Sequence, residues 1–310
     1  MRLAPIVLFV YNRPWHTRQT LTYLKKNDLA SESKLYVFCD GPRPDASSET
    51  LRQIAEVRTV VREEQWCGTV EIVERTTNAG LADSIIEGIT KLTDKYGKVI
   101  VLEDDLVTST GFLRYMNDAL RIYEQEERVM HVCAYMHPID HRQLPETLFF
   151  SHPNSWGWGT WKRAWQHLNT DVRFLMKSIK DKYYFNIDDC YPFFSHLRAN
   201  LSGELKTWAV RWQASVQLKK GLVLYPNQSL VKNIGWDGSG ENCLPNSEKQ
   251  QEVIALAETI SVTSQPVVEN RLARNRIKDY FSKKIKKPNL VSRIKWNVLD
   301  FVNVRLTKNK

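Results

Sequence analysis

Four apolar residues, Val99 to Leu102, lead directly into three consecutive carboxylates, Glu103, Asp104 and Asp105. A continuous apolar run rich in β-branched residues is typical of a strand buried on both faces, as in a parallel sheet. Adjacent carboxylates repel one another unless a cation neutralises them. Hard divalent ions such as Mg²⁺ or Mn²⁺ prefer carboxylate oxygens, and open α/β sheets bind ligands at the carboxyl ends of their strands. The segment therefore predicts a ligand site, with a solvated acidic strand end as the alternative.

Strand-like and helix-like segments alternate along the first 130 residues. The strand-like segments are residues 5–11, 34–42, 69–73 and 98–105, and the helix-like segments are residues 16–25, 46–66, 78–92 and 110–126. Such alternation is typical of an α/β fold with a mainly parallel central sheet, right-handed crossovers and flanking helices. The pattern becomes less regular after residue 130. We therefore expect one α/β domain built from two unlike halves, residues 1–130 and 131–268, followed by a tail, residues 269–310.

Polar residues also follow the first two strand-like segments. Asn12 and Arg13 follow the first, and Asp40 follows the second. Because the carboxyl ends of parallel strands share one edge of a sheet, these side chains would lie along one rim with the three acids. Asn78-Ala-Gly precedes a helix-like segment, and a helix N-terminus after glycine suits a phosphate. Asn78 would equally serve as a cap of that helix.

Two common nucleotide-binding motifs are missing from the sequence. There is no Gly-x-x-x-x-Gly-Lys-Ser/Thr loop, and no Gly-x-Gly-x-x-Gly follows the first strand-like segment. Kinase-like and dinucleotide-binding hypotheses are disfavoured accordingly. A carboxylate-held metal that grips a diphosphate remains as a phosphate-binding device.

A tryptophan- and glycine-rich segment covers residues 155–161. In it Trp156 and Trp158 flank Gly157, so an extended backbone would place both rings on one face. Indole rings offer apolar platforms to sugar rings, and glycine lets a backbone approach closely. The alternative is that these rings pack in the core, because large aromatic side chains dominate protein interiors.

The cysteine pattern and the charge distribution limit the cellular compartment and the kinds of binding partner that the chain can have. The five cysteines never form a Cys-x-x-Cys pair, which disfavours a zinc site or disulfide framework and favours a reducing compartment. No stretch approaches the ~18 apolar residues of a membrane span. The apolar residues 3–11 suit a first strand better than a signal peptide. The net charge of +9 divides into +11 on residues 271–310 and −2 on the remainder.

The basic tail also carries an apolar stripe, Leu290, Ile294, Val298 and Phe301, at helical spacing. A basic amphipathic helix suits an anionic membrane surface, so we expect a cytoplasmic protein that is peripheral on the inner face of the membrane. The alternatives are a solvated or disordered tail and nucleic-acid binding through the tail. We expect no nucleic-acid partner, because the rest of the chain is near neutral.

Six segments together resemble GT-A-fold, nucleotide-sugar-dependent glycosyltransferases of the bacterial surface-polysaccharide type, with a more distant similarity to N-acetylglucosaminyltransferase I. They occur in the family's order, at residues 5–14, 37–42, 78–82, 102–105, 155–161 and 235–240. The resemblance implies a hexosyl- or N-acetylhexosaminyltransferase that moves a sugar, with inversion, from a UDP-sugar to a glycan or lipid-linked acceptor. It also implies assistance by Mn²⁺ or Mg²⁺, a nucleotide-sugar site in residues 1–130 and an acceptor site in residues 131–268.

The resemblance further implies roles for individual residues. Nucleotide contacts fall on Asn12, Arg13, Asp40, Asn78, Leu81, Ala82, Glu103 and Asp104, the metal on Asp105, and sugar or acceptor contacts on Trp156, Gly157, Trp158, Trp208 and Arg211. Thr207 occupies the position where N-acetylglucosaminyltransferase I has the aspartate that acts as the base. Glu204 and Asp237 are therefore the candidate catalytic bases.

A sugar-1-phosphate nucleotidyltransferase is the alternative enzyme on a related sheet. It would require a glycine-rich loop with Arg or Lys after the first strand. The sequence there is Tyr11-Asn12-Arg13-Pro14, which favours the glycosyltransferase.

Overall fold

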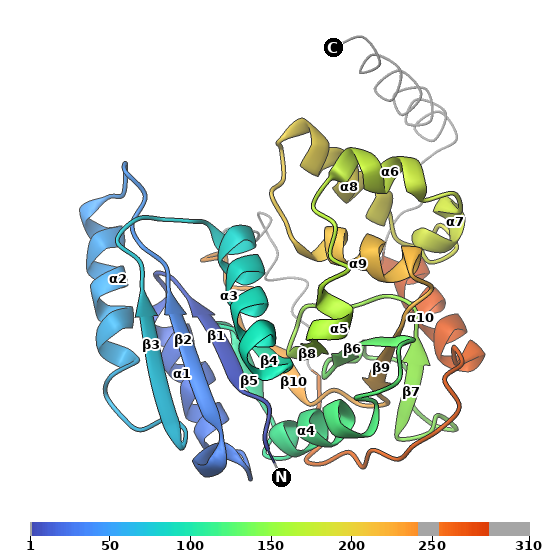
Figure 1. Ribbon diagram of the computed structural model, residues 1–310, viewed down its shortest axis with the longest axis horizontal. Helices are drawn as coiled ribbons and strands as arrows, with labels where there is room; N and C mark the ends of the chain where they lie inside the picture. Colours follow the sequence, from blue (N-terminus) through green and yellow to red (C-terminus); the bar gives the residue numbers. More distant parts are fainter. Residues whose placement is uncertain (1, 241–253, 285–310) are drawn as a thin grey trace.

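The computed structural model describes residues 2–240 and 254–284, and its centre is an eight-stranded sheet (Figure 1). The strand order is β3-β2-β1-β4-β8-β6-β9-β7. The strands are β1 Ile6–Val10, β2 Lys34–Cys39, β3 Thr69–Glu74, β4 Lys98–Glu103, β6 Val129–Cys133, β7 Thr147–Phe150, β8 Trp158–Trp161 and β9 Leu222–Pro226. Only β8 and β7 run against the other strands of this sheet. The prediction of an α/β fold with a mainly parallel central sheet is confirmed.

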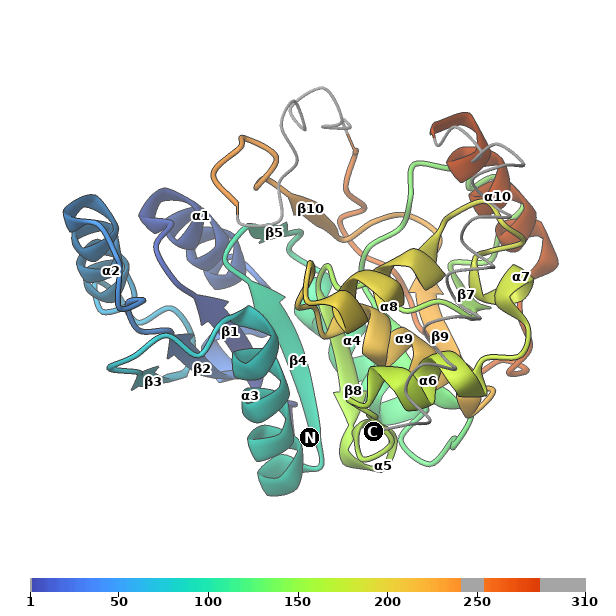
Figure 2. The same cartoon turned by 90° about the horizontal axis from the view of Figure 1, so that it is seen from above.

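Helices of the first half cover both faces of the sheet (Figure 2). Helices α1 (Pro14–Lys25) and α2 (Ser48–Val60) pack on one face, and α3 (Leu81–Tyr96) packs on the other. Successive side chains of β1 alternate between the two cores: Leu8 joins the α1 side, and Val7 and Phe9 join the α3 side. This alternation is the period of two that a strand imposes on its side chains.

Helix α4 (Phe112–Ile122) ends the run of helices in the first half, and the second half adds shorter helices around the remaining strands. They are α5 Lys162–Trp165, α6 Val172–Ser178, α7 Lys182–Phe185, α8 Phe193–Ser202 and α9 Ala209–Leu218. A second, two-stranded sheet joins β5 (Leu106–Thr108) to β10 (Val231–Asn233) in antiparallel register. Because β5 follows the acidic triplet directly, this pairing brings residues 233–240 beside the acids.

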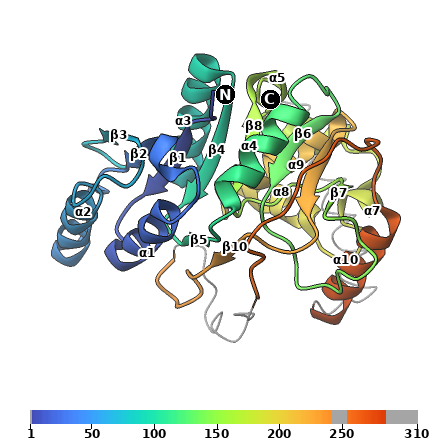
Figure 3. The same cartoon turned by 90° about the horizontal axis from the view of Figure 1, so that it is seen from below.

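Helix α10 (Arg271–Lys284) packs on the body beside β7 and α7 (Figure 3). Ala273 and Ile277 are completely buried, so the first part of the predicted tail, up to Lys284, packs on the folded body. The stripe that begins at Leu290 lies outside the described residues. Within residues 2–240 and 254–284, no helix combines the length and apolar character that crossing a membrane requires.

Candidate active site

Arg13 lies between two carboxylates at the end of β4. Its Nη2 contacts Asp104 Oδ1 and lies 3.0 Å from Asp105 Oδ2. The contact follows from the sheet register, because β1 pairs with β4 and Phe9 lies opposite Glu103. Thr20 on α1 donates a hydrogen bond of 2.8 Å to the backbone oxygen of Asp104, which fixes the helix after Arg13 to this strand end. The guanidinium therefore neutralises part of the acidic cluster predicted from the sequence.

Glu103, the first acid of the triplet, is desolvated. Burial, followed by the nearby charges of Asp105 and Asp104, raises the pKa of Glu103 to about 8. Its carboxyl group accepts no hydrogen bond from the described residues. Glu103 is thus the acid whose charged form burial disfavours, and Asp104 and Asp105 are the carboxylates beside the guanidinium.

The loop after β10 covers the acidic cluster. Ile234 N donates to the backbone oxygen of Asp105 at 2.8 Å. A Cβ at Gly235 would collide with Asp105 Oδ2 and lie 2.9 Å from Arg13 Nη1. Glycine is therefore required for this close approach of the loop to Asp105 and Arg13.

Asp237, a candidate base, lies in the same loop. Its carboxylate accepts hydrogen bonds from Ser239 N at 3.0 Å and Ser239 Oγ at 2.6 Å, and lies 3.1 Å from His16 Nε2. Burial acts to raise its pKa, but the Ser239 hydrogen bonds and His16 outweigh burial and lower the pKa of Asp237 below its usual value. A carboxylate held in this way is a weaker proton acceptor.

Asp40 is fastened to the loop before α3. Its Oδ1 accepts from Gly41 N at 2.9 Å and Ala79 N at 3.0 Å, and its Oδ2 accepts from Gly80 N at 3.0 Å. The N–H groups that the sequence offered to a phosphate are thus taken by this carboxylate. Asp40 consequently shapes the loop between β2 and α3.

Asn78 does not cap α3. Gly80, with φ of +79°, occupies the N-cap position of α3. The Asn78 amide donates instead to Gly41 O at 2.9 Å, so it holds the loop after β2. Leu81 is exposed at the first turn of α3, and Ala82 is buried beneath it.

A hollow of about 330 Å³, here called the rim hollow, lies next to Asn12. Its lining residues are Tyr11, Asn12, Arg43, Asp45, Ala46, Ser47 and Thr50. They come from the end of β1, the loop after β2 and the start of α2. Of this set, only Asn12 was singled out from the sequence. For Arg43, Asp45, Ala46 and Ser47, the available signal was a polar loop between a predicted strand and a predicted helix.

Trp158 and Trp208 are core residues. Trp158 is completely buried, with its ring stacked 4.9 Å from Trp208 and 4.7 Å from His131 between ring centroids. Trp208 is 3% exposed. Both rings are therefore packed in the interior, and their predicted sugar contact stays a prediction that this packing does not favour. Their contribution is to hold α9 against β8.

Trp156 lies apart from these buried rings. It is only partly buried and meets Trp236 edge-to-face at 6.1 Å between centroids. Gly157 follows with φ of +62°, and a Cβ there would lie 2.7 Å from Val231 Cγ1. The Trp156–Trp236 pair therefore joins the segment before β8 to the loop that covers Asp105.

The remaining predicted residues lie near the start of α9. Glu204 is exposed in the loop after α8, and Lys206 in that loop forms a 2.6 Å ion pair with Asp83 on α3. Arg211 is buried, donates to Thr207 O at 2.8 Å, and has a pKa lowered by burial. The structure therefore brings Glu204 to the side of α3, and it uses Arg211 to stabilise the first turn of its own helix.

The acidic cluster has the donor chemistry for a hard divalent ion. No group of three His, Cys, Asp or Glu side chains suited to a metal occurs within residues 2–240 and 254–284. Mg²⁺ sites in phosphate-transferring enzymes commonly use one or two carboxylates and complete their coordination with substrate phosphates and water. Asp104 and Asp105 fit that arrangement by the chemistry of their side chains.

No family model and no curated protein sequence matches this chain. Several solved structures share a loose likeness. A mannosyltransferase from Pyrobaculum calidifontis in complex with GDP-Man and Mn²⁺ is 10% identical, with a TM-score of 0.40 over 70% of this chain and 68% of that one. Residues 1–349 of S. aureus TarS are 14% identical, with a TM-score of 0.39 over 74% of this chain and 60% of that fragment. A UDP-glucose pyrophosphorylase complexed with UDP-glucose is 10% identical, with a TM-score of 0.34 over 72% of this chain and 90% of that one. Likeness at this level assigns no activity.

Proposed function

We propose that this chain is a glycosyltransferase that moves a hexosyl or N-acetylhexosaminyl group from a UDP-sugar to a glycan or lipid-linked acceptor. The observation that carries the proposal is the cluster of Arg13, Asp104 and Asp105 at the carboxyl end of β4. The cluster is covered by the loop at Gly235, and the rim hollow lies beside the same end of β1. Carboxylates that can hold a divalent ion, an arginine beside them and a neighbouring hollow are what a metal-bound nucleoside diphosphate requires.

The nucleoside would bind in the rim hollow. The Asn12 amide lies 3.4 Å from Gln53 Oε1, a long hydrogen bond that a base or ribose could replace at little cost. Asp40 and Asn78 would support this site by fixing the loop between β2 and α3. Leu81 would offer an apolar contact at the first turn of α3.

Asp105, with Asp104, would hold Mn²⁺ or Mg²⁺ together with the donor diphosphate. When bound, such an ion stabilises the negative charge that builds up on the leaving diphosphate. Before the donor binds, Arg13 would reduce the electrostatic repulsion between the two carboxylates. It also adds a permanent positive charge to the diphosphate site. Glu103, at the end of β4, would contact a sugar or ribose oxygen.

The transfer itself would be a single displacement with inversion. The acceptor hydroxyl oxygen forms a bond to the anomeric carbon, and the bond from that carbon to the diphosphate oxygen breaks, with its electron pair leaving on UDP. The hydroxyl proton passes to a base. Glu204, which accepts no hydrogen bond from the described residues, is the better candidate, because Asp237 is already engaged by Ser239.

Calorimetric titration with UDP in Mn²⁺ and in chelator tests the donor site, and a thermal-shift screen of nucleotide sugars identifies the donor. We expect UDP to bind at least tenfold more tightly with metal. Equal affinity in both conditions would contradict metal-assisted binding. Release of pyrophosphate from UTP and a sugar 1-phosphate, without release of UDP from any nucleotide sugar, would indicate a nucleotidyltransferase.

Residues 271–310 are proposed to bind an anionic membrane surface on the cytoplasmic side, near lipid-linked acceptors. Within α10, Arg274 and Lys278 are already paired with Asp188, and residues 285–310 would add seven further Lys and Arg side chains. Truncation after Lys284 keeps α10 and should abolish sedimentation with anionic liposomes at low salt. Unchanged sedimentation would remove the membrane proposal. We propose no nucleic-acid partner, and a gel-shift measurement would test this.

A further inference from the structure

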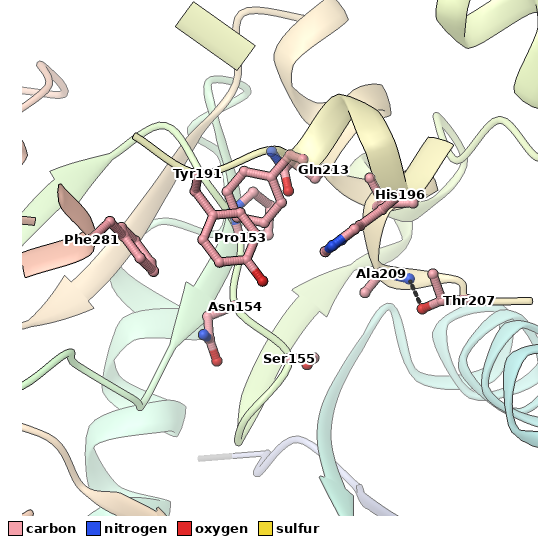
Figure 4. Close-up of a pocket in the computed structure, with 11 residues that line it drawn as sticks. Pro153, Asn154, Ser155, Tyr191, His196, Thr207, Ala209, Gln213 and Phe281 are labelled. Atoms are coloured by element: carbon pink, nitrogen blue, oxygen red, sulfur yellow. Dashed lines mark hydrogen bonds between the residues drawn. The ribbon is translucent and has the colours of Figure 1, made fainter. Parts of the chain in front are cut away.

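A second hollow, of about 190 Å³, lies in the second half of the chain (Figure 4). We call it the aromatic hollow. Its lining residues are Pro153, Asn154, Ser155, Tyr191, Phe193, His196, Thr207, Ala209, Val210, Gln213 and Phe281. They come from the segment before β8, from α8 and the segment preceding it, from α9 and the residues before it, and from α10. None of these residues was predicted from the sequence to bind a ligand.

Three rings form the aromatic wall. Tyr191 lies 4.3 Å from Phe193 and 4.9 Å from Phe281 between ring centroids. Phe281 belongs to α10, which Arg274 anchors through a 2.5 Å ion pair to Asp188. The ion pair therefore ties α10, which carries Phe281, to the segment that carries Tyr191.

The backbone before Tyr191 is strained. Ile187, Asp188 and Asp189 all have positive φ, at 49°, 54° and 59°. Each non-glycine residue in this conformation costs about 1 kcal/mol or more and persists only where its surroundings fix it. Here Arg274 and Lys278 both grip Asp188. Strain of this kind tends to occur at sites that must be held in one shape.

Polar groups face the hollow with unused hydrogen-bonding capacity. The His196 imidazole, the Tyr191 hydroxyl and the Asn154 amide all surround its opening (Figure 4). Among the described residues, no hydrogen-bond partner is found for the His196 ring or the Tyr191 hydroxyl. Burial lowers the pKa of His196, so its ring is neutral at pH 7 and has one nitrogen that accepts a hydrogen bond.

The lining carries no formal charge. It contains no Asp, Glu, Lys or Arg side chain, so an ionic ligand would lose its hydration without gaining a counter-charge. The volume is below the roughly 300–1,000 Å³ of sites that enclose drug-sized ligands, which limits the occupant to about one ring. Aromatic faces beside neutral hydrogen-bonding groups match the alternating C–H and hydroxyl surfaces of a pyranose.

The aromatic hollow connects with the acidic cluster through a short series of contacts. Ser155 lines the hollow and precedes Trp156, and Trp156 meets Trp236. Trp236 follows Gly235, whose backbone lies against Asp105. The segment that lines the aromatic hollow is thus joined to the loop at the proposed donor site through the Trp156–Trp236 pair.

We propose that the aromatic hollow binds one neutral pyranose ring of the acceptor glycan, stacked on Tyr191 and Phe281 and hydrogen-bonded through a hydroxyl to His196. This inference rests on the proposed glycosyltransferase function for its account of where the acceptor lies. The binding of a neutral saccharide can be measured without any donor or turnover.

Saturation-transfer NMR on the full-length protein tests the proposal with four probes. These are methyl β-glucopyranoside, methyl β-galactopyranoside, methyl N-acetyl-β-glucosaminide and the charged methyl β-glucuronide. We expect at least one neutral probe to bind and the glucuronide to bind least. His196→Ala should weaken binding about fivefold to tenfold, as loss of one hydrogen bond in a desolvated site implies. Tyr191→Phe keeps the ring and should have a smaller effect.

His167→Ala is the matched control, because His167 is also partly buried with a pKa lowered by burial but does not line the hollow. It should bind the probes like the wild type. UDP affinity measured alongside separates the two proposals, since neither His196→Ala nor Tyr191→Phe should change it. If no neutral pyranoside binds, or if both variants bind as the wild type does, the acceptor site is not in this hollow, whatever the result with UDP.

Discussion

The two halves of the molecule hold their polar and aromatic side chains in different ways. Before residue 130, partners come from adjacent strand ends: Arg13 meets Asp104 and Asp105 across neighbouring strands, and Asp40 meets the loop after the next strand. After residue 130, partners come from distant segments, as where Arg274 meets Asp188. The first half is therefore specified by its repeating pattern, and the second by contacts that close only when the whole fold forms.

Backbone strain follows the same division. Within the described residues, the non-glycine residues with positive φ are Gln143, Ile187, Asp188, Asp189 and Lys220. All of them lie after residue 130, whereas the positive-φ residues of the first half are glycines, Gly80 and Gly97. Regular β/α units need no strain to place their strand ends. Of the five such residues in the irregular half, three are consecutive, at 187–189, in the segment that shapes the aromatic hollow.

The largest expected effect is that of Asp105→Asn on transfer. The substitution keeps the shape of the side chain and removes one formal charge from the proposed diphosphate site. We expect a loss of about a thousandfold in the rate of UDP release, the scale of removing an electrostatic group from a transition state. The thermal midpoint should stay near that of the wild type, because Asp105 is partly exposed at a strand end.

Asp94→Asn is the control for this substitution. Asp94 is exposed at the far end of α3, where it pairs with Lys162, so the change removes the same charge away from the rim. Its rate should equal that of the wild type. An active Asp105→Asn protein at saturating Mn²⁺ would show that the acidic cluster is not the donor site. An unfolded one would show that the first half depends on the cluster for its stability.

The next effect concerns the buried rings of the second half. Trp158→Ala should cost about 3–5 kcal/mol of unfolding free energy, because it removes a completely buried indole from the contact between β8 and α9. Trp156→Ala, in a partly buried ring two residues earlier, should cost less than half as much. Urea unfolding of both variants measures the difference. Equal costs would mean that Trp156 is as much a core residue as Trp158.

Sequence reasoning succeeds where a local period exists. The apolar run 99–102 and its companions at 5–11 and 34–42 predicted strands, and the structure pairs them in parallel register. Parallel pairing then places the residues after each strand on one edge, so the meeting of Arg13 with Asp104 and Asp105 was predictable as a shared rim. The sequence did not predict that Arg13 bridges the two carboxylates, because this contact depends on the rotamer of one long side chain.

Sequence reasoning fails where a side chain has two chemically suitable uses. Asp40 had the right position for a nucleotide contact, but three backbone N–H groups converge on it only in the folded loop. Trp158 and Trp156 lie in one short segment, yet one is in the core and the other faces Trp236. The aromatic hollow had no signal, because residues as far apart as Asn154 and Phe281 line it.

Acid should destabilise the second half. Burial lowers the pKa of His131 to about 3, whereas in the unfolded chain it titrates near 6.5. Between these values the unfolded state binds a proton that the folded state does not, so stability falls as pH falls below about 6.5. From pH 7 to pH 5 the loss is about 2 kcal/mol for this one group. In His131→Phe the fall should be smaller by that amount.

Exposed His141→Phe is the control for the titration of His131, and it should keep the full loss of stability between pH 7 and pH 5. The measurement is the free energy of unfolding in urea at both pH values. Comparing each variant with itself removes the fixed cost of losing the Trp212 hydrogen bond to His131. An unchanged difference in His131→Phe would show that His131 is protonated in the folded state.

The smallest expected effect separates two ion pairs of nearly equal length. Lys278 lies 2.7 Å from Asp188 within the second half, and Lys206 lies 2.6 Å from Asp83 and joins the two halves. The side chains of the first pair are 29% and 15% exposed, and those of the second are 64% and 53% exposed.

Exposed pairs contribute about 0–1 kcal/mol, because water and salt screen them. Lys206→Met should therefore change the unfolding free energy by less than about 0.5 kcal/mol. Lys278→Met should cost about 1 kcal/mol, because Asp188 sits in a strained segment and would keep only Arg274. Equal costs for the two variants would mean that α10 does not stabilise the left-handed backbone at residues 187–189. The Lys278–Asp188 pair would then contribute no more to stability than the exposed Lys206–Asp83 pair.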